Sequence, residues 1–388
     1  MAKLSIIITV YNLEKYIEKC LRSVMEQQYT DIEIIVVNDG SIDNSGIICN
    51  KLAIEDDRII VVHKNNAGRV LARRTGVENS NSEYIAFVDG DDWIEPDMYI
   101  DMMANATSTS ADLIVSGYIQ VKNGNCIKKF TSIKPGTYSI DEEMDYIRKN
   151  LFCYNNKNEL GIYSSMCTNI YKKNIIGDIF FVIPNDLYMG EDFLFNGLYI
   201  SKCKSVSIMD KAYYNYLIHE NSTVARKCPD LFLQLGYIQQ KLSMVYDSDK
   251  DILESIKKRS FFDFIRLWNF ENEDDFLHVP YYALDFSWIE NKSVALYGAG
   301  AVGRDYHWIM KKTYPKVLKT WVDKNFLVAQ ENGLEVEGIE RLKEWDYDVI
   351  LIAVESEQVA NEIKVELSNE FGICEDKLVW HKPKFYWI

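Results

Sequence analysis

The chain has 388 residues, enough for two or three domains, and its 47% of apolar residues excludes a largely disordered protein. Its 43 basic and 58 acidic residues give a formal net charge of −15, which excludes nucleic acid as an expected partner and disfavours anionic lipid wherever basic residues do not cluster. The eight cysteines are scattered, with no Cys-x-x-Cys pair, so we expect reduced thiols and no zinc site.

The first residues run into a strand pattern rather than a signal peptide, and no apolar run approaches the roughly 20 residues of a spanning helix. We therefore expect a cytoplasmic protein, with the inner face of the membrane as a candidate site of peripheral contact. A helical segment at 251–270 mixes basic and aromatic residues that suit such contact. A bridging helix or a homo-oligomer contact is the preferred interpretation of this segment in so acidic a chain.

Short apolar runs alternate with helical patterns in the first part of the chain. The periodicity predicts strands at 4–10, 32–38, 59–63 and 84–89, and helices at 45–55, 67–79 and 12–27, the last capped by Asn12. This alternation implies a parallel sheet, in which ligands bind beyond the carboxyl ends of the strands. Clusters of polar residues occur at those ends.

The rest of the chain contains three further patterns. Residues 112–121 and 127–131 flank Asn123-Gly124, a hairpin signal, and a helix from Gly190 to Ser201 precedes two predicted strands that end at Leu217. Residues 229–270 have helical periodicity. A new unit then begins, with strands at 293–297, 317–322 and 349–354 and helices at 301–312 and 359–367.

An acidic cluster, Asp89-Gly90-Asp91-Asp92, follows the strand at 84–89. Carboxylates so close together repel one another, and a divalent cation completed by a substrate diphosphate would offset that repulsion. Such a cation would also neutralise a leaving phosphate. A solvated acidic turn is the alternative interpretation of a motif this short.

Four motifs occur in order along the chain: residues 5–12, residues 37–43, Asn66-Ala-Gly68 with Ala72-Arg73, and residues 87–93. Together they resemble glycosyltransferase family 2, whose catalytic domain has the GT-A fold. The resemblance covers residues 3–223. It implies an α/β fold class, with a GT-A type mixed sheet flanked by helices. The patterns at 229–270 and 293–367 predict that a helical linker and a small Rossmann-like domain follow.

The resemblance also assigns roles to single residues. Asp39 matches the aspartate that binds the pyrimidine base of a nucleotide-sugar, Tyr11 stacks beside that base, and Thr9 lines its pocket. Arg73 lies near the sugar and diphosphate. The other expected donor-binding residues are Asn66, Gly68, Asp89, Gly90, His219 and Ser222. Packing for Tyr11, a surface position for Arg73 and helix capping for Asp39 are the alternatives.

The same resemblance predicts the catalytic groups. Asp91, with Asp89 and Asp92 beside it, matches the motif that holds Mg²⁺ or Mn²⁺. Asp192 matches the base that deprotonates the acceptor hydroxyl and so gives inverted stereochemistry, with Glu191 as the alternative base. An acidic pair at a helix start also stabilises the helix dipole, which is the structural alternative.

The unit near the end of the chain carries the pattern Gly298-x-Gly300-x-x-Gly303 between a strand and a helix, and Asp323 ends its next strand. This is the fingerprint of a dinucleotide-binding turn, in which the aspartate binds a ribose. No catalytic partner for hydride transfer accompanies it. We expect a structural, dimerising or nucleotide-sensing module here, and an NAD-binding oxidoreductase is the alternative.

We therefore predict a catalytic domain at 1–223, with a nucleotide-binding part at 1–105 and an acceptor part at 106–223. A helical linker at 224–288 and a Rossmann-like domain at 289–388 follow. The predicted function is a metal-dependent inverting hexosyltransferase of bacterial cell-surface polysaccharide synthesis. It would use a nucleotide-sugar, foremost a UDP-sugar, and a glycan or lipid-linked glycan acceptor. A catalytically silent glycan-binding scaffold is a further alternative.

Overall fold

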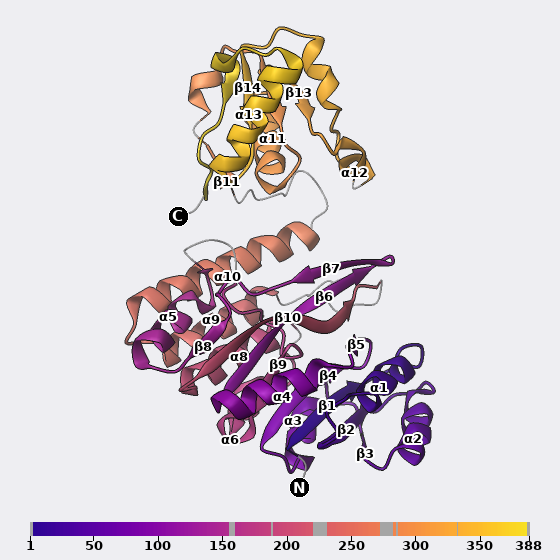
Figure 1. Cartoon of the computed structure of the whole chain (residues 1–388). Coiled ribbons are helices and arrows are strands. Elements are labelled where there is room, and N and C mark those ends of the chain that lie inside the picture. The colour runs from indigo at the N-terminus through magenta and orange to yellow at the C-terminus, as the bar shows by residue number, and fades with distance from the viewer. Residues whose placement is uncertain are drawn as a thin grey trace. The chain divides into compact units, whose positions relative to one another are not determined.

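The computed structural model describes residues 3–154, 160–187, 189–219, 231–271, 282–284, 286–331 and 333–385. The chain divides into two compact units, Met1–Phe264 and Ile265–Ile388, which are described separately (Figure 1). The predicted donor residue Ser222 lies outside the described residues.

One mixed sheet forms the centre of the first unit. Its described strands follow the order β3-β2-β1-β4-β9-β6-β10-β5, with β7 paired to β6 and β8 paired to β10. The neighbours β3, β2, β1 and β4 are parallel, β9 is antiparallel to both β4 and β6, and β10 is parallel to β6. The strands are β1 (Leu4–Val10), β2 (Ile32–Asp39), β3 (Ile59–Lys64), β4 (Tyr84–Asp89), β5 (Trp93–Ile94), β6 (Leu113–Lys122), β7 (Asn125–Lys129), β8 (Gly136–Tyr138), β9 (Asn169–Lys172) and β10 (Val206–Leu217).

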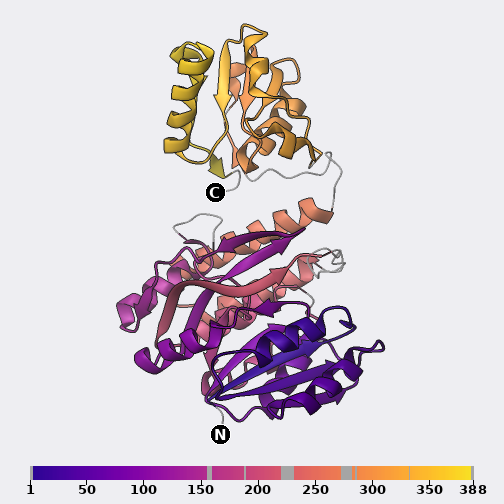
Figure 2. The ribbon, with the colours of Figure 1, turned by 45° about the vertical axis from the view of Figure 1, so that its right-hand side comes forward.

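Helices pack along this sheet, as the two views in Figures 1 and 2 show. They are α1 (Ile17–Met25), α2 (Ser45–Glu55), α3 (Arg69–Asn79), α4 (Met98–Thr109), α5 (Asp141–Leu151), α6 (Lys173–Ile176), α7 (Ile179–Val182), α8 (Glu191–Lys202), α9 (Leu231–Val245) and the first part of α10 (Lys250–Glu271), which ends beyond the unit boundary at Phe264. Because helices cover it, β1 is buried along almost its whole length and reads as a continuous apolar run.

The approach of α3 to β1 depends on Gly76. A Cβ atom at this position would lie 2.2 Å from Cγ2 of Ile7, so only glycine allows the helix to pack this closely. The close packing carries Arg73, on the preceding turn of α3, to the carboxyl end of β4, where its guanidinium meets Asp89.

Two predicted features differ from the structure. Asn12 does not cap a helix, because its backbone is left-handed (φ 54°) and its Oδ1 atom accepts a hydrogen bond from the Ile42 N–H at 2.9 Å, so α1 begins only at Ile17. The two strands predicted before Leu217 are one strand, β10, whose register against β6 shifts between Ile208 and Ala212. The local irregularity of the strand is the reason that the sequence pattern predicted two strands in place of one.

Helices α9 and α10 pack onto the core of the first unit. Leu242 and Ile256 are fully buried in that core, and the Tyr246 hydroxyl donates a hydrogen bond to the Gly197 carbonyl at 2.8 Å. Both helices lie in the segment predicted as a linker. No helix in the described parts of the chain has the length and apolar character that crossing a membrane requires.

The second unit contains a parallel sheet in the order β13-β12-β14-β15 and a separate antiparallel pair, β11 with β16. The strands are β11 (Tyr282–Ala283), β12 (Val294–Tyr297), β13 (Leu318–Val322), β14 (Val349–Ile352), β15 (Leu378–Val379) and β16 (Lys384–Phe385). The helices are α11 (Ala301–Thr313), α12 (Phe326–Glu331) and α13 (Glu357–Phe371).

Candidate active site

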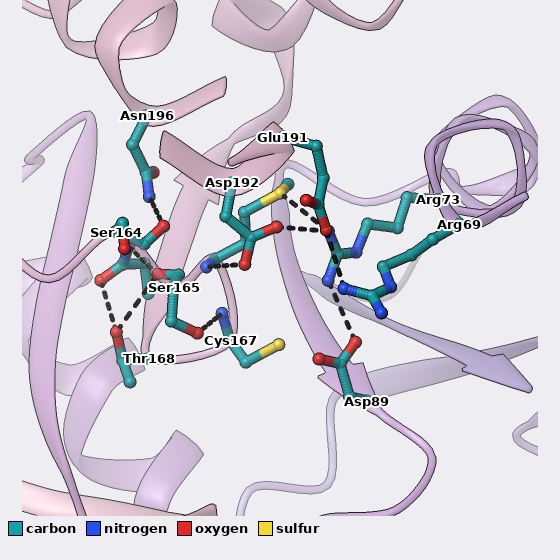
Figure 3. A network of polar contacts seen from close by, with 12 residues as sticks. Arg69, Arg73, Asp89, Ser164, Ser165, Cys167, Thr168, Glu191, Asp192 and Asn196 are labelled. Carbon is teal, nitrogen blue, oxygen red and sulfur yellow. Dashed lines mark hydrogen bonds and ion pairs between the residues drawn. The ribbon is translucent and has the colours of Figure 1, made fainter. Parts of the chain in front are cut away.

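A buried arginine joins the ends of two distant elements (Figure 3). Arg73 is only 1% exposed, and its Nη2 atom lies 3.0 Å from Asp89 Oδ1 at the end of β4. Its Nη1 atom pairs with Asp192 Oδ1 at the start of α8. The structure therefore brings together the acidic motif and the predicted base, which are far apart in the sequence.

Glu191 and Asp192 occupy different environments. Glu191 is buried and pairs with Arg69 Nη1 at 2.8 Å and with Arg73 Nη1 at 3.4 Å. Asp192 is more exposed, and its second oxygen accepts a hydrogen bond from the Met166 N–H at 3.2 Å. Burial raises the pKa of the Asp192 carboxyl to about 6, against the opposing charge of Arg73. A carboxyl with such a pKa can accept a proton near neutral pH.

The acidic motif at the end of β4 divides into two kinds of carboxylate. Asp92 is buried and accepts hydrogen bonds from the Tyr214 hydroxyl at 2.6 Å and the Leu217 N–H at 2.8 Å, so it fixes the end of β10. Asp89 and Asp91 keep 29% and 26% of their side chains exposed. Asp91 Oδ2 lies 3.0 Å from His219 Nε2.

The charges of this motif fit a divalent cation. Burial and then the negative charge of Asp89 raise the pKa of Asp91, whereas Arg73 and Arg69 outweigh the effect of burial and lower the pKa of Asp89. Within the described residues, no group of three or more His, Cys, Asp and Glu side chains is arranged to hold a metal ion. Two carboxylates are the protein ligands that Mg²⁺ commonly takes when substrate phosphates complete its shell. Asp91 and Asp89 fit that arrangement.

The predicted nucleotide residues surround the ends of β1 and β2. Asp39 is buried and accepts bonds from Lys64 Nζ at 2.5 Å and from the Gly68 N–H at 2.9 Å, with the Ala67 N–H shared between its oxygens. Two contacts fall on each carboxylate oxygen, which matches the roughly four acceptor positions of a carboxylate. Tyr11 is half-exposed and Thr9 is partly buried.

Glycines shape the backbone around these residues. Gly90 lies where a Cβ atom would come within 2.9 Å of the Thr9 carbonyl. Gly68, at φ 91°, immediately precedes α3, and a Cβ on Gly40 would meet the backbone nitrogen of the exposed Asn66 at 2.6 Å. These close approaches hold the loop after β4 against the end of β1, and the loop after β2 against the loop after β3.

Several residues of the site are not apparent from the sequence. Arg69 pairs with Glu191, and Lys64 pairs with Asp39. The Tyr214 hydroxyl donates a hydrogen bond to Asp92 and accepts one from the Asp89 N–H at 3.1 Å. The (i, i+4) spacing of Arg69 and Arg73 on one helix was the only available signal, because residues so spaced share a helix face. No sequence pattern pointed to Lys64, and the resemblance of residues 214–217 to a family segment gave Tyr214 no role.

The glycine pattern of the second unit forms a tight turn. Gly298 has φ 113°, and a Cβ on Gly303 would lie 1.8 Å from the Gly298 carbonyl oxygen. Asp323 accepts hydrogen bonds from the Ala299 N–H at 2.7 Å and the Asn325 N–H at 2.6 Å. Gly300, by contrast, has open space where a Cβ would stand. These interactions hold the turn against the end of β13.

Comparison with known proteins gives consistent results. The model of the family "Glycosyl transferase family 2" matches residues 5–180. GlyA of Streptococcus pneumoniae, a glycosyltransferase, is 33% identical over 57% of this chain and 31% of its own length. EpsH of Bacillus subtilis, a putative glycosyltransferase, is 32% identical over 66% of this chain and 72% of its own. This chain thus spans less than a third of GlyA but most of EpsH.

Among solved structures, TarS 1–349 of S. aureus in complex with UDP-GlcNAc is similar in fold. It has a TM-score of 0.52 and 23% identity, over 70% of this chain and 72% of that one. The predicted α/β fold with a mixed GT-A type sheet is confirmed by this likeness and by the sheet order. The ordered motifs, the fold and the similarity to EpsH agree, and the chain belongs to glycosyltransferase family 2.

Proposed function

We propose that this chain is an inverting glycosyltransferase that moves a sugar from a nucleotide-sugar to a hydroxyl group of a glycan. The observation that carries the proposal is the position of Arg73, which pairs with Asp89 of the acidic motif and with Asp192 of α8. One guanidinium group spans only a few ångströms. The donor diphosphate and the acceptor hydroxyl can therefore meet in one site.

Asp192 is the proposed base. Its carboxylate accepts the proton of the acceptor hydroxyl as the oxygen bonds to the anomeric carbon, and the electron pair of the breaking bond leaves with the diphosphate. Attack opposite the leaving group inverts that carbon. Arg73 and the Met166 N–H each bind one oxygen of Asp192 and so orient it. Glu191 is less suited, because Arg69 and Arg73 both bind it and it is buried.

Asp91 and Asp89 are the proposed ligands of Mg²⁺ or Mn²⁺. When bound, the cation would neutralise the charge that develops on the leaving diphosphate. Asp92 has a positioning role in this proposal, since its bonds to Tyr214 and Leu217 hold the end of β10 beside the motif. That end places His219 against Asp91.

A uridine nucleotide is the proposed donor class. TarS, which shares the fold, is described in complex with UDP-GlcNAc and with UDP. In this proposal the N–H of a pyrimidine base replaces one of the donors that Asp39 now binds, and the half-exposed ring of Tyr11 is available for stacking. We assign transfer to residues 1–223 and treat 289–388 as an appended Rossmann-like module.

A thermal-shift panel tests the proposal. The full chain is heated with UDP, GDP, CDP, their common sugar conjugates or NAD, each with Mn²⁺ or with EDTA. We expect a rise in Tm with uridine nucleotides and Mn²⁺, because a ligand that binds only the folded state stabilises it. Asp91→Ala should lose the Mn²⁺-dependent part, and the exposed Asp57→Ala is the control. A shift with NAD alone would overturn the proposal.

A further inference from the structure

One stretch of the first unit departs from the acidic character of the chain. The whole protein has 58 acidic residues and a net charge of −15, yet residues 113–140 contain no Asp or Glu. The same stretch carries lysines at 122, 128, 129 and 134. It therefore forms a local positive region, and it coincides with strands β6, β7 and β8.

The lysines lie on a hairpin at the edge of the sheet. Among the described strands, β7 pairs with β6 alone (Figure 1). Asn123 and Gly124 form the turn between the two strands, with φ 50° and 80°. Lys122, Lys128 and Lys134 are exposed and Lys129 is partly exposed. Over the described residues, no ion pair joins these four lysines to a carboxylate. Their charge is available to an external partner.

Large apolar side chains are exposed among these lysines. Ile127 is 52% exposed and Phe130 is 42% exposed. Because side chains alternate along a strand, Ile127 shares one face of β7 with Lys129, and Phe130 directly follows the strand. We call Lys122, Ile127, Lys128, Lys129, Phe130 and Lys134 the hairpin surface.

We propose that the hairpin surface docks onto a bilayer that contains anionic lipids. Lysines near such a surface are attracted to its negative potential, and their flexible stems let the ammonium groups stay among the headgroups while apolar neighbours enter the interface. Ile127 and Phe130 are the neighbours that would do so. A hydrated polyanion in solution would pair with the lysines, but it would not remove the apolar side chains of Ile127 and Phe130 from water.

Protection of an edge strand is a simpler role for the lysines. Charges on an edge prevent pairing with another sheet. That role does not explain why Ile127 on β7 and Phe130 directly after it are exposed, since apolar side chains at a sheet edge promote association. Edge protection also gives no reason for the absence of Asp and Glu from residues 113–140.

The hairpin begins beside the candidate active site. The Ile218 N–H donates to the Val121 carbonyl at 2.9 Å, and the adjacent Leu217 N–H donates to Asp92. Docking would therefore hold the site close to the membrane surface, where a lipid-linked acceptor would be presented. This consequence rests on the proposed function, whereas the docking itself does not.

Vesicle sedimentation with the full chain tests the docking. Vesicles of phosphatidylglycerol and phosphatidylcholine in equal parts should bind the protein, pure phosphatidylcholine should not, and about 0.5 M NaCl should weaken the binding. Lys128→Glu with Lys129→Glu should reduce partitioning by at least about tenfold. Lys202→Glu with Lys204→Glu, which reverses two exposed charges elsewhere on the unit, should change it less than twofold. Ile127→Ser with Phe130→Ser should also weaken it.

A site-specific label distinguishes docking from general adhesion. Cys126 lies on β7 and Cys374 lies in the second unit, and both are exposed. Two variants are labelled with an environment-sensitive dye: one keeps Cys126 and has Cys228 and Cys374 replaced by Ser, and the other keeps Cys374 and has Cys126 and Cys228 replaced by Ser. On anionic vesicles the dye emission should shift to the blue at Cys126 and remain unchanged at Cys374. Equal partitioning of the hairpin and control variants would overturn the proposal. So would binding to soluble polyphosphate without binding to vesicles, or self-association of the hairpin variants with no change in vesicle binding.

Discussion

Arg73 on α3 and Asp192 on α8 form an ion pair although 119 positions of sequence separate them. The Arg73 side chain is almost fully buried. The pair is one side of a larger network, because the same guanidinium binds Asp89 and Glu191. A buried arginine with three carboxylate partners fixes the position of each. The geometry of the proposed transfer therefore depends on this residue.

Replacement of the proposed base should separate transfer from donor binding. Asp192→Asn should lower kcat by about 10²–10⁴-fold and leave the nucleotide-dependent rise in Tm intact, because only proton transfer is lost. Glu191→Gln is the control and should retain more activity. The measurement is sugar transfer with a set of glycan acceptors. Turnover of Asp192→Asn equal to that of the wild type would assign the base elsewhere.

The pH profile should report the same carboxyl. The pKa of Asp192 is raised to about 6, and a base must be deprotonated to act. Activity should therefore rise as the pH increases through about 6 and level off above it. Steady-state rates between pH 5 and 8 measure this limb at saturating donor and metal. If Asp192→Asn no longer shows this rise of activity with pH, the rise is assigned to Asp192. An unchanged rise in the variant would contradict the assignment.

Removal of Arg73 should destabilise the first unit. Arg73→Ala leaves Asp89, Glu191 and Asp192 without their shared cation, and removing one partner of a buried pair costs about 3–5 kcal/mol. Urea unfolding measures the change in free energy. Arg69→Ala is the milder comparison, because the Arg69 side chain is 37% exposed. A loss below about 1 kcal/mol for Arg73→Ala would contradict the prediction.

The Tyr214 hydroxyl should be important for stability. Tyr214→Phe removes the donor to buried Asp92 and the acceptor of the Asp89 N–H, which should cost about 1–3 kcal/mol. Tyr213→Phe is the matched control, since its hydroxyl binds Asp101 in a more exposed position and its loss should cost less. Urea unfolding of both variants tests the order, and the reverse order would contradict it.

The two glycines of the second unit should respond differently to alanine. Gly303→Ala forces a Cβ against the Gly298 carbonyl and should destabilise that unit by about 3 kcal/mol. Gly300→Ala meets open space and should be nearly neutral. Limited proteolysis of the full chain, followed by mass spectrometry, locates the weakened unit. Equal protection of residues 286–385 in both variants would show that the turn tolerates the extra atom.

The sequence predicted most strands and helices of the first unit because their apolar periodicity is local. The strand predicted at 4–10 coincides with β1, and the helix predicted at 45–55 coincides with α2. The start of α1 was wrong, since Asn12 makes its hydrogen bond with Ile42, a residue distant in the chain. Local propensity carries no information about such a partner.

The sequence by itself determined the family, the alternation of strands and helices, and the chemical types at the ends of β1, β2 and β4. It could name Asp89, Asp91 and Asp192 as candidates, because those motifs are short and contiguous. Only the tertiary structure decided which carboxylates are paired, buried or exposed. Arg69 and Arg73 meet Glu191 and Asp192 through the packing of α3 against β1, and Tyr214 reaches Asp92 through the register of β10. Charge and burial depend on neighbours in space, and more than one hundred positions of sequence separate these partners.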